Sequence, residues 1–512
     1  MTKTQAIVAT LLAYNVVLIT IGLWASRRTH DNEDFFLGGR RLGGWVAALS
    51  ASASSSSAWT LLGVSGAAYA WGISALWLFP ATLSGFAINW LWVGPRLMEQ
   101  SRASRSVTLT EFLAGDPNHP LFRAVMRLSS VVIVFSFVFY IASQFQAAGH
   151  AFESALGTSM LVSTAIGVTI IVLYTLMGGF WAVSVTDVIQ GLTMAACAVI
   201  VPVAALRAVG GPGALADGLR AVSSTQQLQI TGSFSGVMGI AFVLGTLGIG
   251  LGYPGQPHVV NRFMAIRDPQ ALRVGRSVSL VWAVIIYSGM LLTGLCARVL
   301  FPAFSNSEQI LFEAANQLLP AVVAGIVIAA VLSAIMSTAD SQLLVATSSL
   351  SYDLQRGRGK SRKGGAGAAG SAGSGLRSAG SGLRSGEKDA GSGLLHPASE
   401  AGPGLLHSRI IVVAISFVAM LIGILAPAEI FSRVLFAWTA LGSAFGPPLI
   451  LRLAGRRPGT GATLAAIATG FGATIVANWA FPTAPGDWVE RLVPFFLALG
   501  VSWMGRAKPE SE

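Results

Sequence analysis

The chain has 512 residues, of which 53% are hydrophobic and only 11% are charged, and its mean hydropathy is +0.66. This composition excludes a large soluble enzyme and indicates a polytopic membrane protein. The formal net charge of +11 does not indicate a nucleic-acid partner, because the basic residues gather in alternate loops, as the positive-inside rule requires of a membrane protein.

Apolar stretches of spanning length recur along the chain, so we expect an all-α fold with about thirteen transmembrane helices. They are predicted at residues 6–25, 43–66, 72–97, 123–149, 159–178, 181–207, 233–256, 275–301, 321–350, 408–427, 429–453, 461–481 and 487–505. The first stretch has no basic n-region or cleavage site and is interpreted as a retained helix. Cys197 and Cys296 lie inside spans without metal-ligand spacing, which indicates packing residues.

The basic residues predict the orientation of the chain, because they fall on one side of this topology, which is then the cytoplasmic side. They are Arg27, Arg28, Arg40, Arg41, Arg96, Arg102, Arg105, Arg123, Arg127, Arg262, Arg267, Arg273, Arg276, residues 356–363, Arg452, Arg456 and Arg457. An odd number of spans places the N-terminus outside and the tail, residues 506–512, in the cytoplasm.

Residues 357–408 differ from the rest of the chain, because they are rich in Gly, Ser and Ala and contain near-repeats of Gly-Ser-Gly-Leu-Arg-Ser. This composition predicts a disordered cytoplasmic linker. It divides the membrane domain into a first part, 1–356, and a second part, 409–505. A regulatory or docking role remains an alternative to flexible filler.

The segment from Ser50 to Trp59 carries six serines within an otherwise apolar span. Free polar groups in hydrocarbon cost several kcal/mol each, so such a segment is tolerated at membrane depth where it lines a cavity or binds a ligand. Close helix packing through small residues is the alternative. We therefore expect an interrupted helix and a candidate binding site here.

A second interruption is predicted at residues 245–258, where glycines and two prolines would break a helix that begins near Ser233. The two broken spans are the second and the seventh. An odd offset reverses the direction of crossing, so they correspond to each other in two inverted repeats. This pattern is typical of a transporter whose midplane site lies between discontinuous helices.

Two acidic residues, Asp187 and Asp340, fall inside predicted spans, where acids are costly and usually functional. Ser337, Asp340 and Ser341 share one helix face by their i, i+3, i+4 spacing. If the two acids approach each other, repulsion leaves one protonated or demands a bound cation. A water-bridged structural pair is the alternative.

Several motifs together resemble the sodium/solute symporter family, and within it most closely the bacterial sodium/proline symporters. They lie at residues 35–40, 49–51, 178–187, 252–258, 262–265, 334–338 and 438–447. The similarity runs from about residue 30 to 505, apart from the linker. It implies a leucine-transporter-like inverted repeat of 5+5 helices, over about 43–207 and 233–453, with one extra helix before and two after.

The resemblance also implies ion sites, because matching positions supply the oxygen ligands that a hard cation prefers. The implied sodium ligands are Ala53, Ser56, Ala334, Ser337 and Thr338. A second cation or proton site is implied at Asp187, Asp340 and Ser341. Sodium is the only metal expected, and no other cofactor.

The implied substrate-binding residues are Ser55, Ser57, Trp59, Tyr140, Ile249, Tyr253, Gln256 and Pro257, and Arg40 is a candidate gating residue. Ser55 stands where the proline carriers have an aspartate, and Ile249 where they have a tryptophan. Trp59 and Tyr140 have packing as an alternative role. His258 is interpreted as a solvated helix cap rather than a proton relay.

These observations predict a symporter of a bacterial inner membrane that imports a small amino acid, most simply L-proline, by alternating access driven by sodium. Sodium or proton symport of another small amino acid or a monocarboxylate is the nearest alternative. A non-transporting membrane sensor of the same fold is another. An enzyme is disfavoured, because the sequence has no metal-ligand cluster and no nucleophile paired with a base.

Overall fold

The computed structural model describes residues 3–26, 40–177, 180–353, 403–426 and 428–505. Over these ranges the chain is helical, with one isolated parallel bridge between Leu42 and Ile266. Ten helical stretches of the described chain are long and apolar enough to cross a membrane. The prediction of an all-α membrane protein is confirmed. Most of the predicted linker, residues 357–408, lies outside the described residues.

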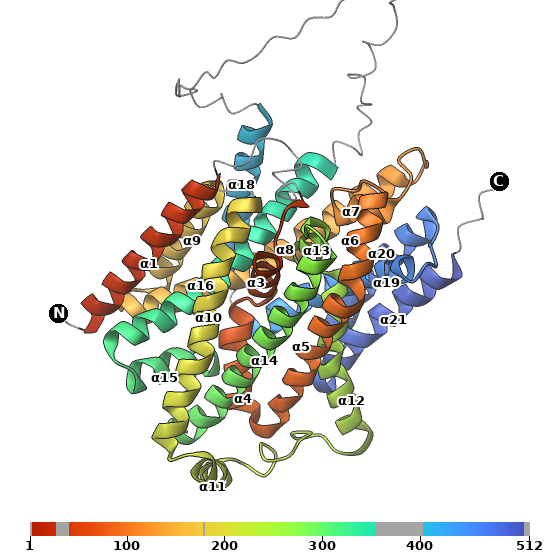
Figure 1. Ribbon diagram of the computed structural model, residues 1–512. Helices are drawn as coiled ribbons and strands as arrows, with labels where there is room; N and C mark the ends of the chain where they lie inside the picture. The colour runs from red at the N-terminus through yellow and green to blue at the C-terminus, as the bar shows by residue number, and fades with distance from the viewer. Residues whose placement is uncertain (1–2, 27–39, 178–179, 354–402, 427, 506–512) are drawn as a thin grey trace, which may run out of the picture.

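The helices follow one another with short π and 3₁₀ segments (η) between them (Figure 1). Their bounds are α1 Lys3–Ser26, α3 Gly44–Ser55, η2 Trp59–Gly63, α4 Val64–Trp71, η3 Gly72–Trp77, α5 Leu78–Ala87, η4 Ile88–Val93, α6 Gly94–Ala103, α7 Leu109–Ala114, α8 Phe122–Leu156, α9 Met160–Met177, α10 Phe180–Val209, α11 Pro212–Val222, α12 Gly236–Leu247, η5 Gly248–Gly255, α13 Pro257–Ala265, α14 Pro269–Leu300, η6 Ser307–Gln309, α15 Ile310–Leu318, α16 Ala321–Ser348, η7 Ser349–Asp353, α18 Pro403–Leu425, α19 Ile430–Leu453, α20 Thr460–Ala480, η8 Pro485–Asp487 and α21 Trp488–Met504.

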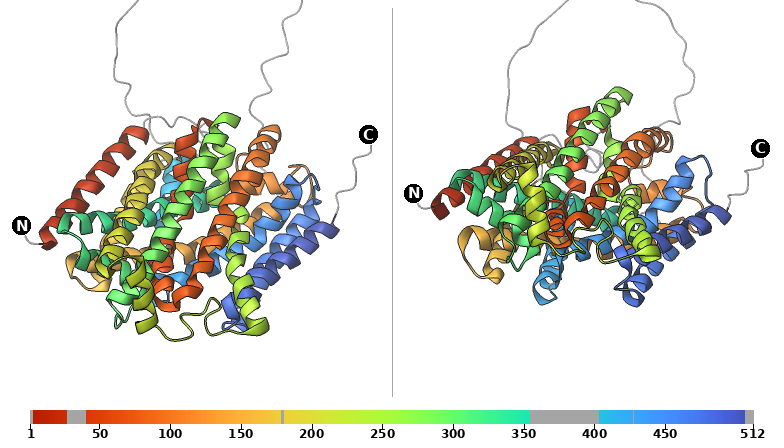
Figure 2. Two further views of the ribbon diagram at one scale, coloured as in Figure 1. Left: turned by 60° about the horizontal axis from the view of Figure 1, so that its bottom comes forward. Right: turned by 90° about the horizontal axis from the view of Figure 1, so that it is seen from below.

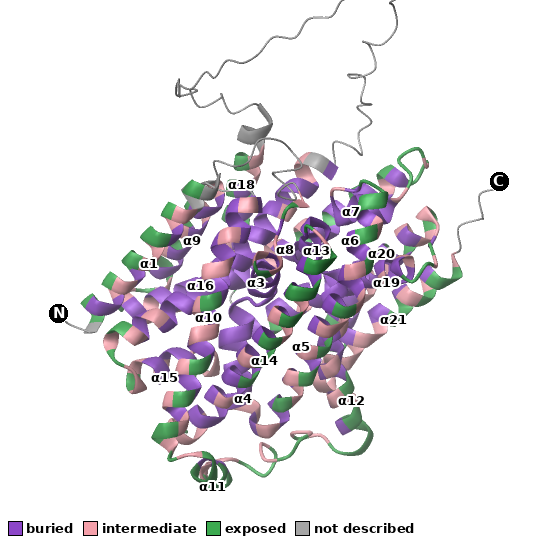
Figure 3. Ribbon diagram, in the orientation of Figure 1, coloured by how far each residue is buried: buried purple, intermediate pink, exposed green. Residues whose placement is uncertain are grey.

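Helix α3 lies at the centre of the bundle and contacts α10, α14, α13 and α16. Its residues from Ala47 to Ser55 are all buried, and Figure 3 shows buried residues concentrated along these inner helices. Outer helices such as α1 and α21, which lie at opposite edges of the bundle (Figure 2), expose large apolar side chains including Leu12, Val16 and Phe496. This distribution suits a bundle whose outer surface faces lipid.

One end of the bundle carries Arg40, Arg102 and Arg267 and is called the basic end below. There the chain just before α3 pairs with the chain just after α13. The Leu42 N–H donates to the Ala265 carbonyl at 3.1 Å, and the Arg267 N–H donates to the Leu42 carbonyl at 2.9 Å. Arg102 donates to the Ile266 carbonyl at 2.5 Å. The N-terminal end of α3 is thus joined to the C-terminal end of α13.

Candidate functional site

The first predicted break is confirmed, and it is confined to Ser56 and Ser57. Helix α3 ends at Ser55, Ser56 has φ −115° and ψ 83°, and a π turn begins at Trp59. Side chains take up backbone donors that the break frees: the Ala58 N–H donates to Gln144 Oε1 at 3.0 Å and the Trp59 N–H to Ser57 Oγ at 3.2 Å. These contacts explain how an interrupted backbone is tolerated at this depth.

The second predicted break is also confirmed, with its position refined. Helix α12 continues into the 3₁₀ segment η5, and the chain becomes extended only at Gln256, with φ −89° and ψ 102°, before Pro257 opens α13. Gly252 is required here, because a Cβ on it would lie 2.3 Å from Trp438 Nε1. The glycine-rich run therefore serves close packing of η5 against α19 as well as the break itself.

A group of uncharged oxygens lies where α16 meets the end of α3. Ser337 Oγ donates to the Ala53 carbonyl at 3.1 Å and to the Ala334 carbonyl at 3.3 Å. Thr338 Oγ1 donates to the Ser54 carbonyl at 3.1 Å. These side chains are all buried. Of the five predicted sodium ligands, the structure thus brings Ala53, Ala334 and Ser337 into direct contact and places Thr338 against the next carbonyl.

Ser56, the remaining predicted sodium ligand, follows directly along the chain. Its N–H donates to the Ala53 carbonyl at 3.1 Å, so it lies at the same turn of backbone. We call Ala53, Ser54, Ala334, Ser337 and Thr338 the neutral oxygen group. Hydroxyl and carbonyl oxygens of this kind are the ligands that a hard cation prefers.

A charged group lies beside it, built around the guanidinium of Arg262 on α13. The guanidinium donates to Asp187 Oδ2 at 3.0 Å, and the two side chains are 2% and 0% exposed. It also donates to Ser50 Oγ at 2.8 Å, Ser54 Oγ at 2.6 Å and Ser341 Oγ at 2.7 Å. Helices α3, α10, α13 and α16 therefore meet at one buried cation.

The second predicted acid, Asp340, belongs to the same charged group. Ser341 Oγ donates to Asp340 Oδ1 at 3.4 Å, and Asp340 itself is fully buried. Within the described part of the chain, Asp340 Oδ2 and Asp187 Oδ1 have no hydrogen-bond partner. The structure thus assembles all three residues predicted for a second cation site, together with an arginine that the prediction did not include.

The prediction that Arg262 belongs to a loop is wrong, because the residue lies within a helix and is buried. Because α13 begins at Pro257, Arg262 lies in its second turn, on the face that packs against α3. The interpretation of His258 as a solvated cap is wrong for the same reason: its ring is fully buried and packs edge-on against Phe137 at 5.3 Å. A sequence signal for Arg262 did exist, since two intramembrane acids require a counter-charge.

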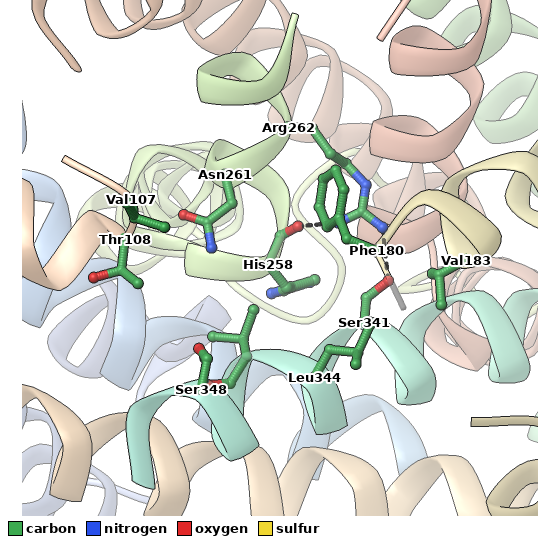
Figure 4. A pocket seen from close by; sticks show the side chains of 11 residues that line it. Val107, Thr108, Phe180, Val183, His258, Asn261, Arg262, Ser341, Leu344 and Ser348 are labelled. Carbon is green, nitrogen blue, oxygen red and sulfur yellow. Dashed lines mark hydrogen bonds between the residues drawn. The ribbon is translucent and has the colours of Figure 1, made fainter. Parts of the chain in front are cut away.

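A small cavity of about 20 Å³, room for about one water molecule, lies next to the charged group between α10, α13 and α16 (Figure 4). Arg262 forms part of its wall, and the ring of Phe180 lies 5.6 Å from the guanidinium carbon. The other lining residues are Val107, Thr108, Val183, His258, Asn261, Ser341, Leu344, Val345 and Ser348. The cavity therefore connects the surroundings of Arg262 with the segment that precedes α7.

The predicted substrate-binding aromatics gather around the two breaks. Tyr140 donates its hydroxyl to Ser57 Oγ at 3.3 Å. The hydroxyl of Tyr253 lies 3.2 Å from that of Tyr287, whose ring is 6.3 Å from that of Trp59. Sequence reasoning missed Tyr287, because a single tyrosine in an apolar span gives no signal of its own.

The other predicted substrate-binding residues make contacts that support the backbone at the breaks. Gln256 Nε2 donates to the Gly252 carbonyl at 3.1 Å and to the Trp438 carbonyl at 2.8 Å. Ile249 accepts a 3.2 Å hydrogen bond from Trp438 Nε1 on its carbonyl. Ser55 Oγ turns back to the Ser52 carbonyl at 3.0 Å, and Pro257 is buried at the start of α13.

Arg40, the candidate gating residue, lies at the basic end with a left-handed backbone, φ 54°. It donates to the Met264 carbonyl at 3.3 Å and to the Ser106 carbonyl at 2.7 Å. Because Met264 is near the end of α13, Arg40 connects this half-helix to the segment that precedes α7.

An all-helical membrane chain with two broken helices facing each other defines the class of secondary transporters. The chain belongs to the sodium:solute symporter family, because that family's model matches residues 35–363 and near-full-length relatives exceed 30% identity. Family membership places it among sodium-coupled transporters of small solutes in a membrane. The predicted family is thereby confirmed.

Three curated relatives illustrate the similarity. The osmoregulated proline transporter OpuE of Bacillus subtilis is 32% identical over 96% of this chain and 92% of its own length. The high-affinity proline transporter PutP of the same organism is 32% identical, with 94% and 93% covered. A sodium/proline symporter of Staphylococcus aureus is 34% identical over 68% of this chain and 69% of its own.

Solved structures share the fold. A Na⁺-coupled sialic acid symporter in a substrate-bound outward-open state aligns with a TM-score of 0.74 at 18% identity, covering 98% of this chain and 97% of that one. Mhp1, a nucleobase-cation-symport-1 family transporter in a closed conformation, aligns with a TM-score of 0.52 at 12% identity, covering 92% and 95%.

Proposed function

We propose that this protein is a Na⁺-coupled symporter that imports a small amino acid, with L-proline as the first candidate, by alternating access. The observation that carries the proposal is the neutral oxygen group at the first break, in a chain 32% identical to two proline transporters over nearly its whole length. The architecture proposed with it is thirteen transmembrane helices, arranged as an inverted 5+5 repeat with one helix before and two after.

The proposed sodium ligands are Ala53, Ser56, Ala334, Ser337 and Thr338. Three observations support them: carbonyls exposed at the end of α3, hydroxyls from α16 pointing at those carbonyls, and burial of the whole group. A sodium ion there would hold α3 and α16 together. If that arrangement favours substrate binding, then substrate binding must favour sodium binding by the same factor.

The proposed substrate site is the space around the two breaks, with Ser55, Ser57, Trp59, Tyr140, Ile249, Tyr253, Gln256 and Pro257 as its residues. Amide groups exposed at a half-helix N-terminus would receive the substrate carboxylate. Asp187, Asp340 and Ser341 are proposed as a second cation or proton site. Arg40 is proposed to act in gating, since it holds the end of α13.

The proposed location is a bacterial plasma membrane, with the basic end in the cytoplasm and the N-terminus outside. Arginine-rich loops at that end support this orientation. Residues 357–408 then form a cytoplasmic linker. A sodium ion entering across 100 mV gains about 2.3 kcal/mol, which is enough to concentrate a zwitterionic substrate about fiftyfold.

Uptake of radiolabelled proline into proteoliposomes, with and without an inward sodium gradient, tests this function. We expect accumulation that requires sodium and that unlabelled proline abolishes. Thr338→Val should weaken the sodium dependence, whereas Thr474→Val, which removes a hydroxyl bonded only within α20, should not. Proline uptake that is equal with and without sodium would contradict the proposal.

A different solute is the second candidate, and specific residues favour it. Ser55 supplies no carboxylate, and its hydroxyl turns back to Ser52, while Ile249 is not aromatic. Both features alter the surroundings of a proline ring. A panel of unlabelled amino acids and monocarboxylates in the same assay distinguishes the two. Inhibition by another acid with none by proline would establish the second candidate, and saturable binding without accumulation would indicate a sensor.

A further inference from the structure

We propose that the guanidinium of Arg262 is a built-in competitor for the second cation site: it occupies that site while α13 is docked and must leave before sodium can bind there. This inference rests on the proposed function, because it concerns the site at Asp187, Asp340 and Ser341. It adds a cation of the chain's own to that site and connects the site to the movement of a half-helix.

The first argument is the set of partners of the guanidinium. Its nitrogens contact Asp187 Oδ2 at 3.0 Å and the hydroxyls of Ser50, Ser54 and Ser341 at 2.8, 2.6 and 2.7 Å. These are one carboxylate and three hydroxyl oxygens from three helices, which is also the chemistry of a sodium site. Two cations cannot share these oxygens, because like charges in a buried site repel strongly.

The second argument is that the site has unused capacity for a cation. Asp187 Oδ1 and Asp340 Oδ2 are buried, and each lacks a hydrogen-bond partner among the described residues. One guanidinium cannot neutralise both acids. When Arg262 departs, two carboxylates and the three hydroxyls therefore remain for an external cation.

The third argument is mobility of the element that carries the arginine. Helix α13 is nine residues long and is separated from η5 by the extended residue Gln256, whereas Asp187 and Ser341 belong to the long helices α10 and α16. The arginine side chain lies at the wall of a small cavity (Figure 4). Displacement of α13 would thus remove the guanidinium from Asp187 and Ser341, which the two long helices carry.

It follows that docking of α13 and sodium occupancy of this site exclude each other. Sodium leaving toward the basic end is replaced by the arginine, and the cytoplasmic side closes behind it. Sodium present on the cytoplasmic side opposes this step. The carrier should therefore be inhibited by internal sodium, with Arg262 setting the concentration at which inhibition occurs.

The test is uptake into membrane vesicles of known orientation, loaded with increasing internal sodium. In Arg262→Gln, internal sodium should inhibit uptake at a concentration at least fivefold lower than in the wild type, because the competing guanidinium is gone. Arg262→Lys should shift in the same direction by less. Arg267→Gln is the matched control. It removes an exposed charge at the same end, whose ion pair with Asp268 lies outside the charged group, and it should leave the inhibition unchanged.

Equal inhibition of the wild type and both Arg262 variants would overturn the inference. Because Arg262→Gln leaves Asp187 unpaired, Asp187→Asn/Arg262→Gln is made alongside it, and this double variant should lose the tightened inhibition. Binding of ²²Na⁺ to purified protein gives a readout independent of transport: Arg262→Gln should bind sodium more tightly than the wild type. If the wild type shows no sodium-driven uptake, the proposed function fails, while this binding comparison still decides the inference.

Discussion

The neutral oxygen group and the charged group lie side by side between α3 and α16, yet they are built from opposite chemistry. Ser54 belongs to both, since its carbonyl accepts from Thr338 while its hydroxyl contacts Arg262 and Asp187. The neutral group contains only dipoles and needs no counter-charge when it is empty. The charged group contains two acids, and one internal cation, Arg262, pairs with one of them.

This difference has an energetic consequence. When no ion is bound, the carbonyl and hydroxyl groups of the neutral oxygen group hydrogen-bond to one another, and each such bond contributes little net free energy. An ion can therefore bind and leave readily. A buried ion pair is costly when one partner is removed. Substitutions in the charged group should therefore affect folding, whereas those in the neutral group should affect the response to sodium.

The largest expected effect is that of Asp187→Asn, which leaves Arg262 buried without its ion-pair partner. Breaking a buried pair costs about 3–5 kcal/mol, so the melting temperature of the purified protein should fall by many degrees. Asp217→Asn is the control, because its pair with Arg220 is exposed and its loss should not be measurable. A variant Asp187→Asn as stable as the wild type would show that the charged group does not hold the helices together.

Thr338→Val should come next, with an effect on sodium rather than on stability. Losing one hydroxyl ligand at about 1.4 kcal/mol corresponds to a tenfold change in affinity. Half-maximal uptake should therefore require about tenfold more external sodium. Titration of uptake with external sodium measures this requirement. An unchanged titration would show that Thr338 is not a sodium ligand.

Ser341→Ala should have a smaller effect, because the guanidinium keeps Asp187, Ser50 and Ser54 as partners. Loss of one hydrogen bond to a charged group costs about 1.5 kcal/mol or more when nothing compensates, but the remaining partners, which also include the His258 carbonyl, should reduce this. The melting temperature should drop far less than in Asp187→Asn, and Ser341→Thr should retain wild-type behaviour. A drop as large as that of Asp187→Asn would mean that the Ser341 hydroxyl and the Asp187 carboxylate stabilise the fold as one unit.

The smallest effect concerns Asp353, a buried carboxyl at the basic end that has hydroxyl partners such as Thr108 at 3.1 Å. Burial raises the pKa of Asp353 to about 7, with hydrogen bonds from Thr108, Thr110 and Ser349 opposing the shift. Because the unfolded carboxyl has a pKa of about 4, the folded protein binds the proton more tightly. Stability from this group is therefore lost as the pH rises from about 4 through 7.

Asp353→Asn should flatten this part of the pH dependence. Melting curves between pH 5 and pH 8 should show the wild type losing stability relative to the variant as the pH rises. Parallel curves would indicate that hydroxyl partners are sufficient to keep this carboxyl ionised, which would weaken the contrast between neutral and charged surroundings.

The two breaks could be predicted from the sequence because their causes are local. Serines at 54–57 and the Gly-Tyr-Pro-Gly-Gln-Pro run at 252–257 carry their conformational preferences with them. The contacts of Ser337 with Ala53 followed from the family resemblance. The approach of Asp187 to a cation could be expected from the cost of an intramembrane acid.

The identity of that cation could not be predicted in the same way. Arg262 lies five residues before Arg267 in a segment whose charges fit a cytoplasmic loop, and only the packing of α13 on α3 makes it a buried residue. Tyr287 is similar, because its position beside Tyr253 depends on how α14 is placed against the second break. Both depend on contacts between elements far apart in the chain.

The pairing of Leu42 with Ile266 gives the basic end a mechanical property. Arg40 lies two residues before this bridge and Arg262 four residues before it on the other strand. A displacement of α13 should therefore move the start of α3 with it. Arg40 and Arg262 should therefore lose their hydrogen-bond partners in the same conformational step.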